Sequence, residues 1–203
     1  MTAEPTVFVV DDNPSVRKSL HSLIEAAGLA VETYASAGEF LGAYDGTRPG
    51  CLVLDVRLRN ENGLDVQDEL RRRKTMLPII VMTGYADVPT SVRAFKGGAI
   101  DFLRKPVPPK ALVERIREAI AMDEQARESA TVSTAVAERI ALLTARERQV
   151  MELLAVGNSS KEIAAALDIS VRTVESHRRT VLRKMGVASA AQLAHAVSGQ
   201  SRR

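Results

Sequence analysis

Five polar residues in the first half of the chain each stand beside a short apolar run, and their types suit phosphoryl chemistry. They are Asp11, Asp12, Asp55, Thr83 and Lys105. Three carboxylates held close together repel one another, and a hard divalent cation such as Mg²⁺ offsets that repulsion. An aspartate side chain can accept a phosphoryl group, and an ammonium and a hydroxyl can bond to its oxygens. If the fold brings these residues together, they form a phosphoryl-accepting site.

The apolar runs indicate strands, and helical patterns lie between them. The runs are 7–10, 31–34, 51–54, 78–83 and 101–103. Apolar strands in strict alternation with helices predict a parallel sheet that is covered on both faces. We expect an α/β fold with a doubly wound, five-stranded parallel sheet that ends near Lys105-Pro106 and is followed by a fifth helix. Because ligands bind beyond the carboxyl ends of such strands, the polar residues should meet at one rim.

Local signals mark the helix ends in this half. Pro14 suits a first helical turn and Gly28 a helix end. Ser36 and Glu39 have the spacing of a capping box.

Taken singly, the candidate site residues also have ordinary structural explanations. Asp12 and Asn13 precede Pro14 as a helix cap would, Thr83 could bond to backbone groups in a turn, and Phe102 could be core. Only the coincidence of the five polar residues at the ends of predicted strands favours a site.

Four segments resemble the receiver domain of two-component response regulators, and the resemblance covers about residues 5–121. The segments are VVDDNPSVR, LVLDVRLRNENG, IIVMTG and DFLRKPV. The resemblance implies that Asp55 accepts the phosphoryl group. It also implies that Asp12, Asp55 and the backbone carbonyl of Arg57 bind Mg²⁺, while Asp11 helps through water.

The same resemblance assigns residues to a switch and exposes one departure. Thr83 and Phe102 match the paired switch positions of the family, and Lys105-Pro106 matches its Lys-Pro, where a cis bond is usual. Leu58-Arg59 stands where the family commonly has Met-Pro. This departure predicts a more mobile loop and altered phosphorylation.

Charge is spread unevenly along the chain. Residues 1–106 carry 13 Lys+Arg and 14 Asp+Glu, residues 107–140 carry 5 and 6, and residues 141–203 carry 10 and 5. The excess positive charge at the C-terminal end predicts a polyanionic partner for that part alone.

The segment between the two halves has two interpretations. A helical pattern starts at Pro109, but its apolar spacing breaks at Asp123 and Arg127. An extension of the fifth helix, pairing with its copy in a dimer, and a plain polar linker fit this pattern equally well. We predict a receiver domain over 1–121, a helical linker over 122–140 and a DNA-binding domain over 141–203.

The last 60 or so residues predict four short helices with clear starting signals. Thr144 with Glu147, Ser159 with Glu162, and Ser189 with Gln192 match the capping box, and Ser170 can cap alone. Residues 159–186 read as a helix, a tight turn and a second helix.

The second helix has an apolar and a polar face. The predicted apolar face holds Val171, Val174, Val181 and Met185. The opposite face carries Arg172, Ser176, Arg179, Thr180 and Arg183, as a helix in the major groove would. Glu175 is a further candidate for base contact, and Lys161, Thr173, His177 and Lys184 are candidates for phosphate contact. For His177 a packing role is equally compatible, whereas His21 and His195 are ordinary helix residues.

Residues 143–186 are similar to the LuxR-type DNA-binding domain, so the whole chain resembles a response regulator of the NarL/FixJ class. This resemblance implies a transcription factor, and not an enzyme, whose phosphorylation at Asp55 promotes dimerisation and frees the recognition helix. The expected partners are double-stranded DNA, a sensor histidine kinase, a second copy when phosphorylated, and RNA polymerase.

Two alternatives come from other classes of protein. A phosphatase of the haloacid-dehalogenase type needs an acid two residues after its nucleophile, and Arg57 stands there. A constitutive DNA-binding regulator with a receiver that is never phosphorylated stays open because of Arg59. No apolar run approaches the roughly 18 residues of a membrane span. The one cysteine, Cys51, reads as a buried residue in a reducing compartment, so we expect a cytoplasmic protein.

Overall fold

The computed structural model describes residues 4–59, 61–84 and 87–198. The chain divides into two compact units, Met1–Arg127 and Glu128–Arg203. No helix among the described residues is both long enough and apolar enough to cross a membrane.

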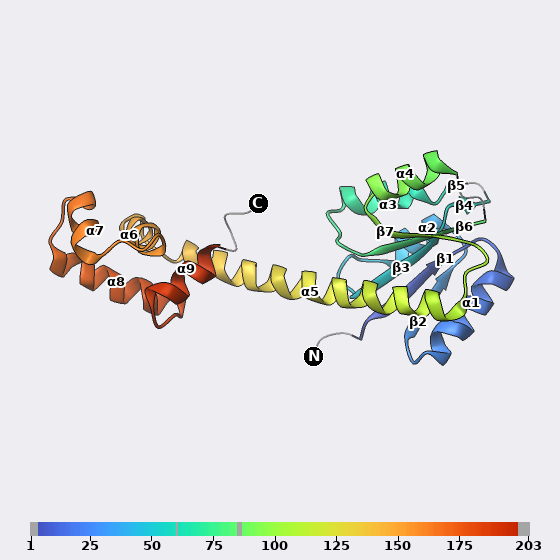
Figure 1. Ribbon diagram of the computed structural model, residues 1–203, viewed down its shortest axis with the longest axis horizontal. Coiled ribbons are helices and arrows are strands. Elements are labelled where there is room, and N and C mark those ends of the chain that lie inside the picture. Colours follow the sequence, from blue (N-terminus) through green and yellow to red (C-terminus); the bar gives the residue numbers. More distant parts are fainter. Residues whose placement is uncertain (1–3, 60, 85–86, 199–203) are drawn as a thin grey trace. The chain divides into compact units, whose positions relative to one another are not determined.

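The first unit is built on a parallel five-stranded sheet, as predicted (Figure 1). Its strands are β1 (Thr6–Val10), β2 (Ala30–Tyr34), β3 (Gly50–Asp55), β6 (Ile79–Thr83) and β7 (Ala99–Arg104), in the order β2-β1-β3-β6-β7. The helices are α1 (Pro14–Ala26), α2 (Ala37–Ala43), α3 (Leu64–Arg72), α4 (Val88–Lys96) and α5 (Pro109–Ala141). The sequence analysis did not predict the two-stranded hairpin that directly follows β3, which pairs β4 (Arg57–Leu58) with β5 (Glu61–Asn62).

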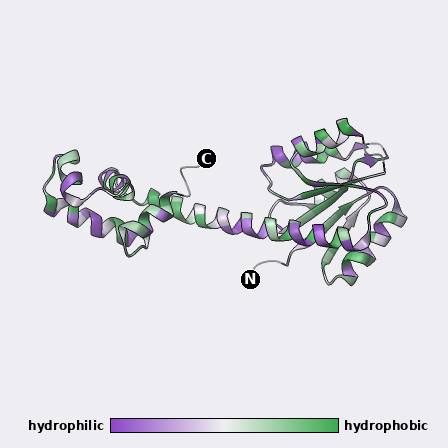
Figure 2. Cartoon of the chain, viewed as in Figure 1, coloured by the Kyte–Doolittle hydropathy of each residue, from purple (hydrophilic) through white to green (hydrophobic). Residues whose placement is uncertain are grey.

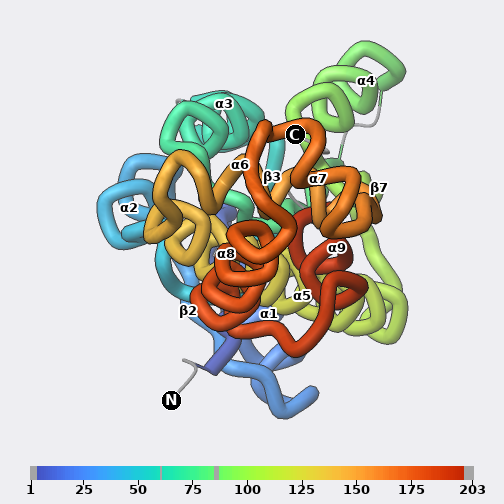
Figure 3. Tube along the Cα trace, turned by 90° about the vertical axis from the view of Figure 1, so that its left-hand side faces the viewer, coloured from blue at the N-terminus to red at the C-terminus, as the bar shows by residue number. Residues whose placement is uncertain are grey.

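Alternate strand residues feed two cores, one on each face of the sheet. Phe8 and Leu52 face the core under α2, α3 and α4, whereas Val7 and Val53 face the core under α1 and α5. Figure 3 shows α2 and α3 on the side of the unit opposite to α1. Figure 2 colours most strand residues as hydrophobic, as burial on both faces requires.

The predicted helix ends are mostly as the sequence signals indicate. Pro14 opens α1, Asn13 caps it by accepting from the backbone N–H groups of Ser15 and Val16, and Gly28 follows it with φ +76°. Because Asn13 is the cap, the Asp12 side chain is not needed for that role. Ser36 caps α2, but the Glu39 carboxylate accepts from the N–H of Ala35 instead of Ser36, so only half of the predicted box forms.

Helix α5 runs without a break through residues 122–140. Asp123, where the apolar spacing fails, is fully buried, and its Oδ2 accepts from the N–H of Gly50 at 2.9 Å and from Arg127 Nε at 2.7 Å. Arg127 also donates to the carbonyl oxygens of Thr47 at 2.7 Å and Arg48 at 2.9 Å. The polar interruption is therefore a clamp that fastens α5 to the loop before β3.

The second unit consists of the end of α5 and four further helices. These are α6 (Ala145–Ala155), α7 (Ser160–Leu167), α8 (Val171–Met185) and α9 (Ala190–Ser198). Both capping boxes predicted at Thr144 and Ser159 are complete, and Ser170 caps α8. The Ser189 hydroxyl accepts from the Gln192 N–H, as predicted. The Gln192 side-chain oxygen, however, accepts from the N–H of Ala188 and not from that of Ser189, so this capping box is incomplete.

One prediction for the core of this unit is wrong. Val174, Val181 and Met185 are buried against α6, α7 and α9, but Val171 is 42% exposed. Val171 is the first residue of α8, whereas the three buried residues lie at later positions of the helix.

Candidate functional site

The carboxyl ends of four neighbouring strands bring the predicted phosphoryl site together. Asp11 follows β1, Asp55 ends β3, Thr83 ends β6 and Lys105 follows β7. One carboxylate oxygen from each of Asp11, Asp12 and Asp55 lies within 4.8 Å of the others. We call these three carboxylates and Lys105 the acidic cluster.

Lys105 links two of the three carboxylates. Its Nζ lies 2.6 Å from Asp11 Oδ2 and 2.6 Å from Asp55 Oδ2. Burial raises the pKa of the Asp55 carboxyl above its ordinary value, and the hydrogen bond from Lys105 opposes that shift only in part. Burial alone would lower the pKa of the Lys105 ammonium, but the hydrogen bonds to Asp11 and Asp55 outweigh it, so the pKa is raised.

Backbone contacts hold the cluster in place. The N–H of Asn13 donates to Asp11 Oδ1 at 2.9 Å, and Arg17 Nη1 donates to the Asp11 carbonyl at 2.7 Å. The Lys105 N–H donates to the Thr83 carbonyl at 2.8 Å, which ties the segment after β7 to the end of β6. Asp11 is therefore fixed in a site where it is 2% exposed.

The loop after Asp55 depends on Gly63, a residue whose role sequence reasoning missed. A Cβ atom at Gly63 would lie 1.9 Å from the Asp55 carbonyl oxygen, closer than any contact allows. The Gly63 N–H donates to the Val56 carbonyl at 2.8 Å, and the Arg57 N–H donates to Asp55 Oδ1 at 3.2 Å. The glycine lets the hairpin fold back against the acceptor strand.

The hairpin itself is anchored on both sides. Leu58 is buried in the core under α2 to α4, and Arg59 is exposed. Glu61 Oε2 accepts from the N–H of Ala37 at 3.0 Å, at the start of α2.

The two predicted switch residues lie on adjacent strands. Thr83, at the end of β6, is fully buried. Phe102, on β7, pairs in register with Val81 and packs half-buried against the core under α2 to α4.

The predicted DNA contacts divide into exposed residues and residues that bond within the unit. Arg172, Arg179 and Arg183 are exposed along one face of α8. Lys161 on α7 and Thr173 and Ser176 on α8 are also exposed, and His177 and Thr180 are half-buried.

Two of the predicted DNA contacts are held by neighbouring helices. Glu175 bonds to Ser160 at the start of α7. Lys184 Nζ lies 2.7 Å from Glu147 Oε2 and donates to the Leu142 carbonyl at 3.1 Å. Arg178 donates to the Ser160 hydroxyl at 3.4 Å, so its head group lies between the helices.

Comparison with known protein families gives two matches. Residues 7–117 match the response regulator receiver domain. Residues 141–197 match the bacterial regulatory proteins of the luxR family.

Relatives of known name match over nearly the whole chain. The transcriptional regulatory protein FixJ of Bradyrhizobium diazoefficiens is 41% identical over 193 residues, which are 95% of this chain and 94% of that protein. The transcriptional regulatory protein TdiR of Thauera aromatica is 40% identical over 95% of this chain and 85% of that protein.

Solved structures give the same result. The response regulator StyR is similar with a TM-score of 0.85 and 39% identity over 97% of this chain and 99% of that one. Full-length FixJ from B. japonicum has a TM-score of 0.61 and 39% identity over 100% of both chains.

Proposed function

We propose that phosphoryl transfer to Asp55 controls the binding of this protein to DNA. The chain belongs to the response regulators that join a receiver domain to a LuxR-type DNA-binding domain. The acidic cluster carries the proposal: three carboxylates converge within 4.8 Å, and Lys105 bonds to Asp55 at 2.6 Å. Asp55 is the cluster member at the very end of a central strand, which suits it to receive a group from outside.

The chain's own residues divide the work of the transfer. One carboxylate oxygen of Asp55 forms the bond to phosphorus, while the bond from phosphorus to the donor breaks and the leaving group keeps the electron pair. The Lys105 ammonium moves from carboxylate to phosphoryl oxygens and stabilises their charge. The Thr83 hydroxyl bonds to the product at the end of β6.

The donor set fits Mg²⁺. Its three carboxylates supply the oxygen ligands that this ion prefers, and the hairpin places the Arg57 backbone beside Asp55. Asp12, Asp55 and the Arg57 carbonyl would hold the ion directly, and Asp11 through water. When bound, Mg²⁺ neutralises charge on the phosphoryl oxygens.

We propose a histidine kinase as the phosphodonor and a homodimer as the phosphorylated form. Thr83 moves toward the phosphoryl group, and Phe102 turns inward from its half-buried position on the next strand. A coupling of about 1–3 kcal/mol between phosphorylation and dimerisation would change DNA affinity about 5- to 150-fold. The dimer would favour half-sites about 10 base pairs apart, or a multiple of that spacing. RNA polymerase is a proposed further partner.

For DNA recognition, the exposed arginines of α8 are the leading residues. Arg172, Arg179 and Arg183 can bond bidentately to guanine or contact phosphates. Lys161, Thr173, Ser176, His177 and Thr180 surround them in the same proposal. The bonds that Glu175 and Lys184 make within the unit favour a structural role for these two residues.

The proposal also covers organisation and location. We place the receiver at 1–121, the helical linker at 122–140 and the DNA-binding domain at 141–203. The protein acts in the cytoplasm as a regulator, not as an enzyme with its own turnover.

The test is labelling by a small phosphodonor with Mg²⁺, read by intact mass. The wild-type chain should gain one phosphoryl group, Asp55→Asn should gain none, and Asp45→Asn, an exposed aspartate elsewhere in the unit, should label normally. Chelating Mg²⁺ should suppress the labelling. An unlabelled wild-type chain would instead support the constitutive regulator. Steady release of phosphate from many substrates, with multiple turnovers, would support an enzyme.

A further inference from the structure

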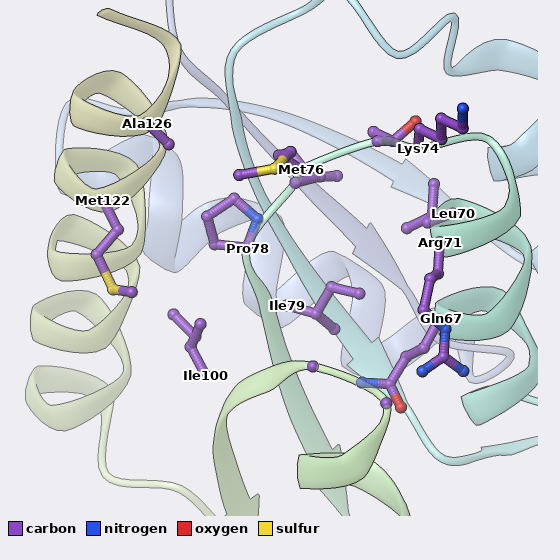
Figure 4. A pocket seen from close by; sticks show the side chains of 14 residues that line it. Gln67, Leu70, Arg71, Lys74, Met76, Pro78, Ile79, Ile100, Met122 and Ala126 are labelled. Atoms are coloured by element: carbon purple, nitrogen blue, oxygen red, sulfur yellow. The ribbon is translucent and has the colours of Figure 1, made fainter. Parts of the chain in front are cut away.

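A cavity of about 460 Å³ opens at the amino-terminal ends of the strands, whereas the acidic cluster lies at their carboxyl ends (Figure 4). Ile79, the first residue of β6, and Ile100, near the start of β7, lie in its wall. The acidic cluster lies beyond the other ends of these parallel strands. The volume is within the range of roughly 300–1,000 Å³ that is typical of small-molecule sites.

The walls of the cavity are largely apolar, and two methionine side chains flank its mouth. Figure 4 shows Met122 on α5 and Met76, on the segment before β6, facing each other across the opening, with Pro78 between them. Met76 is 67% exposed and Met122 is 51% exposed. Methionine side chains adapt to differently shaped apolar surfaces, so this pair suits the entry of an apolar molecule.

One buried polar atom at the end of the cavity lacks a partner. Gln67 on α3 is 2% exposed, and its Nε2 donates to the Ala94 carbonyl at 3.2 Å. That bond fixes the orientation of the amide, because a flip would set two acceptor oxygens against each other. Among the described residues, none donates to Gln67 Oε1. A buried acceptor without a donor is costly and is the feature of this cavity that points to a ligand.

Arg71 lines this end of the cavity. It lies one helical turn after Gln67, and Figure 4 shows its guanidinium beside the Gln67 amide. It bonds to Asp68, and its contact with the Lys96 carbonyl is long, at 3.5 Å. Because the Arg71 side chain is 61% exposed and its surface ion pair with Asp68 is weak, it can move into solvent at little cost and widen this end of the cavity.

We propose that this cavity binds a small, uncharged ring compound with a largely apolar body and one N–H or O–H donor. The ring packs against Met76, Ile100 and Met122, and the donor bonds to Gln67 Oε1. Arg71 and Lys74, which also line the cavity, disfavour protonated amines as the donor group. This site is separate from the phosphoryl site and does not depend on it.

Indole and benzofuran are matched probes, because they differ chiefly in replacing the N–H donor by an oxygen acceptor. The chain contains no Trp, so indole fluorescence can be excited selectively in the presence of the full-length protein. We expect saturable binding of indole. As a competitor, benzofuran should bind about tenfold more weakly, because it leaves the Gln67 oxygen unpaired.

Three variants of the full-length chain separate the polar from the apolar contribution. Gln67→Met keeps the side-chain length and should remove the preference for indole over benzofuran. Ala126→Leu, which fills part of the cavity from α5, should weaken both probes about tenfold. Ala121→Leu places the same residue on an exposed part of α5 outside the cavity and should leave both affinities unchanged. Circular dichroism verifies that each variant is folded.

Several results would overturn the proposal. They are the absence of saturable binding by either probe, equal affinities for the two probes in the wild-type chain, and a preference that survives in Gln67→Met. A chain that self-associates through this face, with Ala126→Leu dissociating the dimer and indole not competing, would assign the cavity to a second copy.

Discussion

The acidic cluster and the exposed face of α8 differ in where their charged side chains come from and in how exposed these side chains are. The cluster joins side chains as far apart in sequence as Asp11 and Lys105, a separation of 94 residues, and Lys105 bonds to two of its three carboxylates. Arg172, Arg179 and Arg183 come from one 15-residue helix and are exposed.

This difference has an energetic consequence. Charges in a buried cluster interact strongly, and removing one partner leaves another uncompensated. Exposed arginines contribute little to stability and remain available to phosphates. Changes around the acidic cluster should therefore alter stability and phosphorylation together, whereas changes on the α8 face should alter DNA binding alone.

The largest expected effect is that of Gly63→Ala. The new Cβ would meet the Asp55 carbonyl oxygen, so the hairpin must move away from the acceptor strand. We expect the free energy of unfolding of the first unit to fall by about 3 kcal/mol, with labelling of Asp55 reduced as well. All three tyrosines lie in this unit and the chain has no Trp, so tyrosine fluorescence in urea follows its unfolding.

Gly42→Ala is the matched control for that variant. Gly42 lies in α2 with nothing within 4 Å of its added Cβ. This change should raise stability by about 0.5–1 kcal/mol and leave labelling intact. Normal labelling and stability in Gly63→Ala would mean that the close approach to Asp55 does not shape the site.

Asp123→Ala sharpens the comparison with a buried acid that lies outside the site. It removes the acceptor for the Gly50 N–H and for Arg127. We expect a loss of about 2 kcal/mol in the free energy of unfolding, measured by tyrosine fluorescence, with labelling of the folded protein unchanged. Glu124→Ala, at an exposed neighbouring position, is the control and should change neither stability nor labelling. A labelling defect in Asp123→Ala would show that this buried acid affects phosphorylation as well as stability, and would contradict its purely structural role.

The contrast between contacts of distant residues and features of neighbouring residues also explains which parts of the structure the sequence could predict. The sheet was predictable because apolar runs and turn residues are local signals, and the strand ends follow from parallel topology. The starts of α6, α7 and α8 were predictable because a cap needs only a few neighbouring residues.

Contacts between distant segments were not predictable. Gly63 is required by the Asp55 carbonyl, and Asp123 by the Gly50 N–H, and neither pair has a local pattern. The helical wheel placed Val171 on the buried face, because a wheel cannot show which positions along a helix the neighbouring helices cover. The wheel also could not show that Lys184 bonds to Glu147.

Arg179→Ala tests the α8 side of the comparison. Loss of an exposed guanidinium should weaken specific DNA binding about tenfold, equivalent to about 1.4 kcal/mol. The unfolding free energy should change by less than about 0.5 kcal/mol. Fluorescence anisotropy of labelled DNA at constant salt measures the affinity, and Arg148→Ala, exposed on α6, serves as the control. A marked loss of stability in Arg179→Ala would remove the distinction between the two regions.

Lys184 is the residue of α8 that should behave like the acidic cluster. Its hydrogen bond lowers the pKa of the Glu147 carboxyl, with help from Thr144. A lowered folded-state pKa contributes stability above the unfolded value of about 4.3, and that stability is lost as the pH falls through the folded value. In Lys184→Met the pKa of Glu147 should rise, so the contribution should be smaller and disappear at a higher pH. Circular dichroism of acid unfolding measures this shift. If Lys184 instead contacts phosphate, the same variant would reduce the salt dependence of DNA binding by about one counterion, whereas the ion pair with Glu147 predicts an unchanged slope.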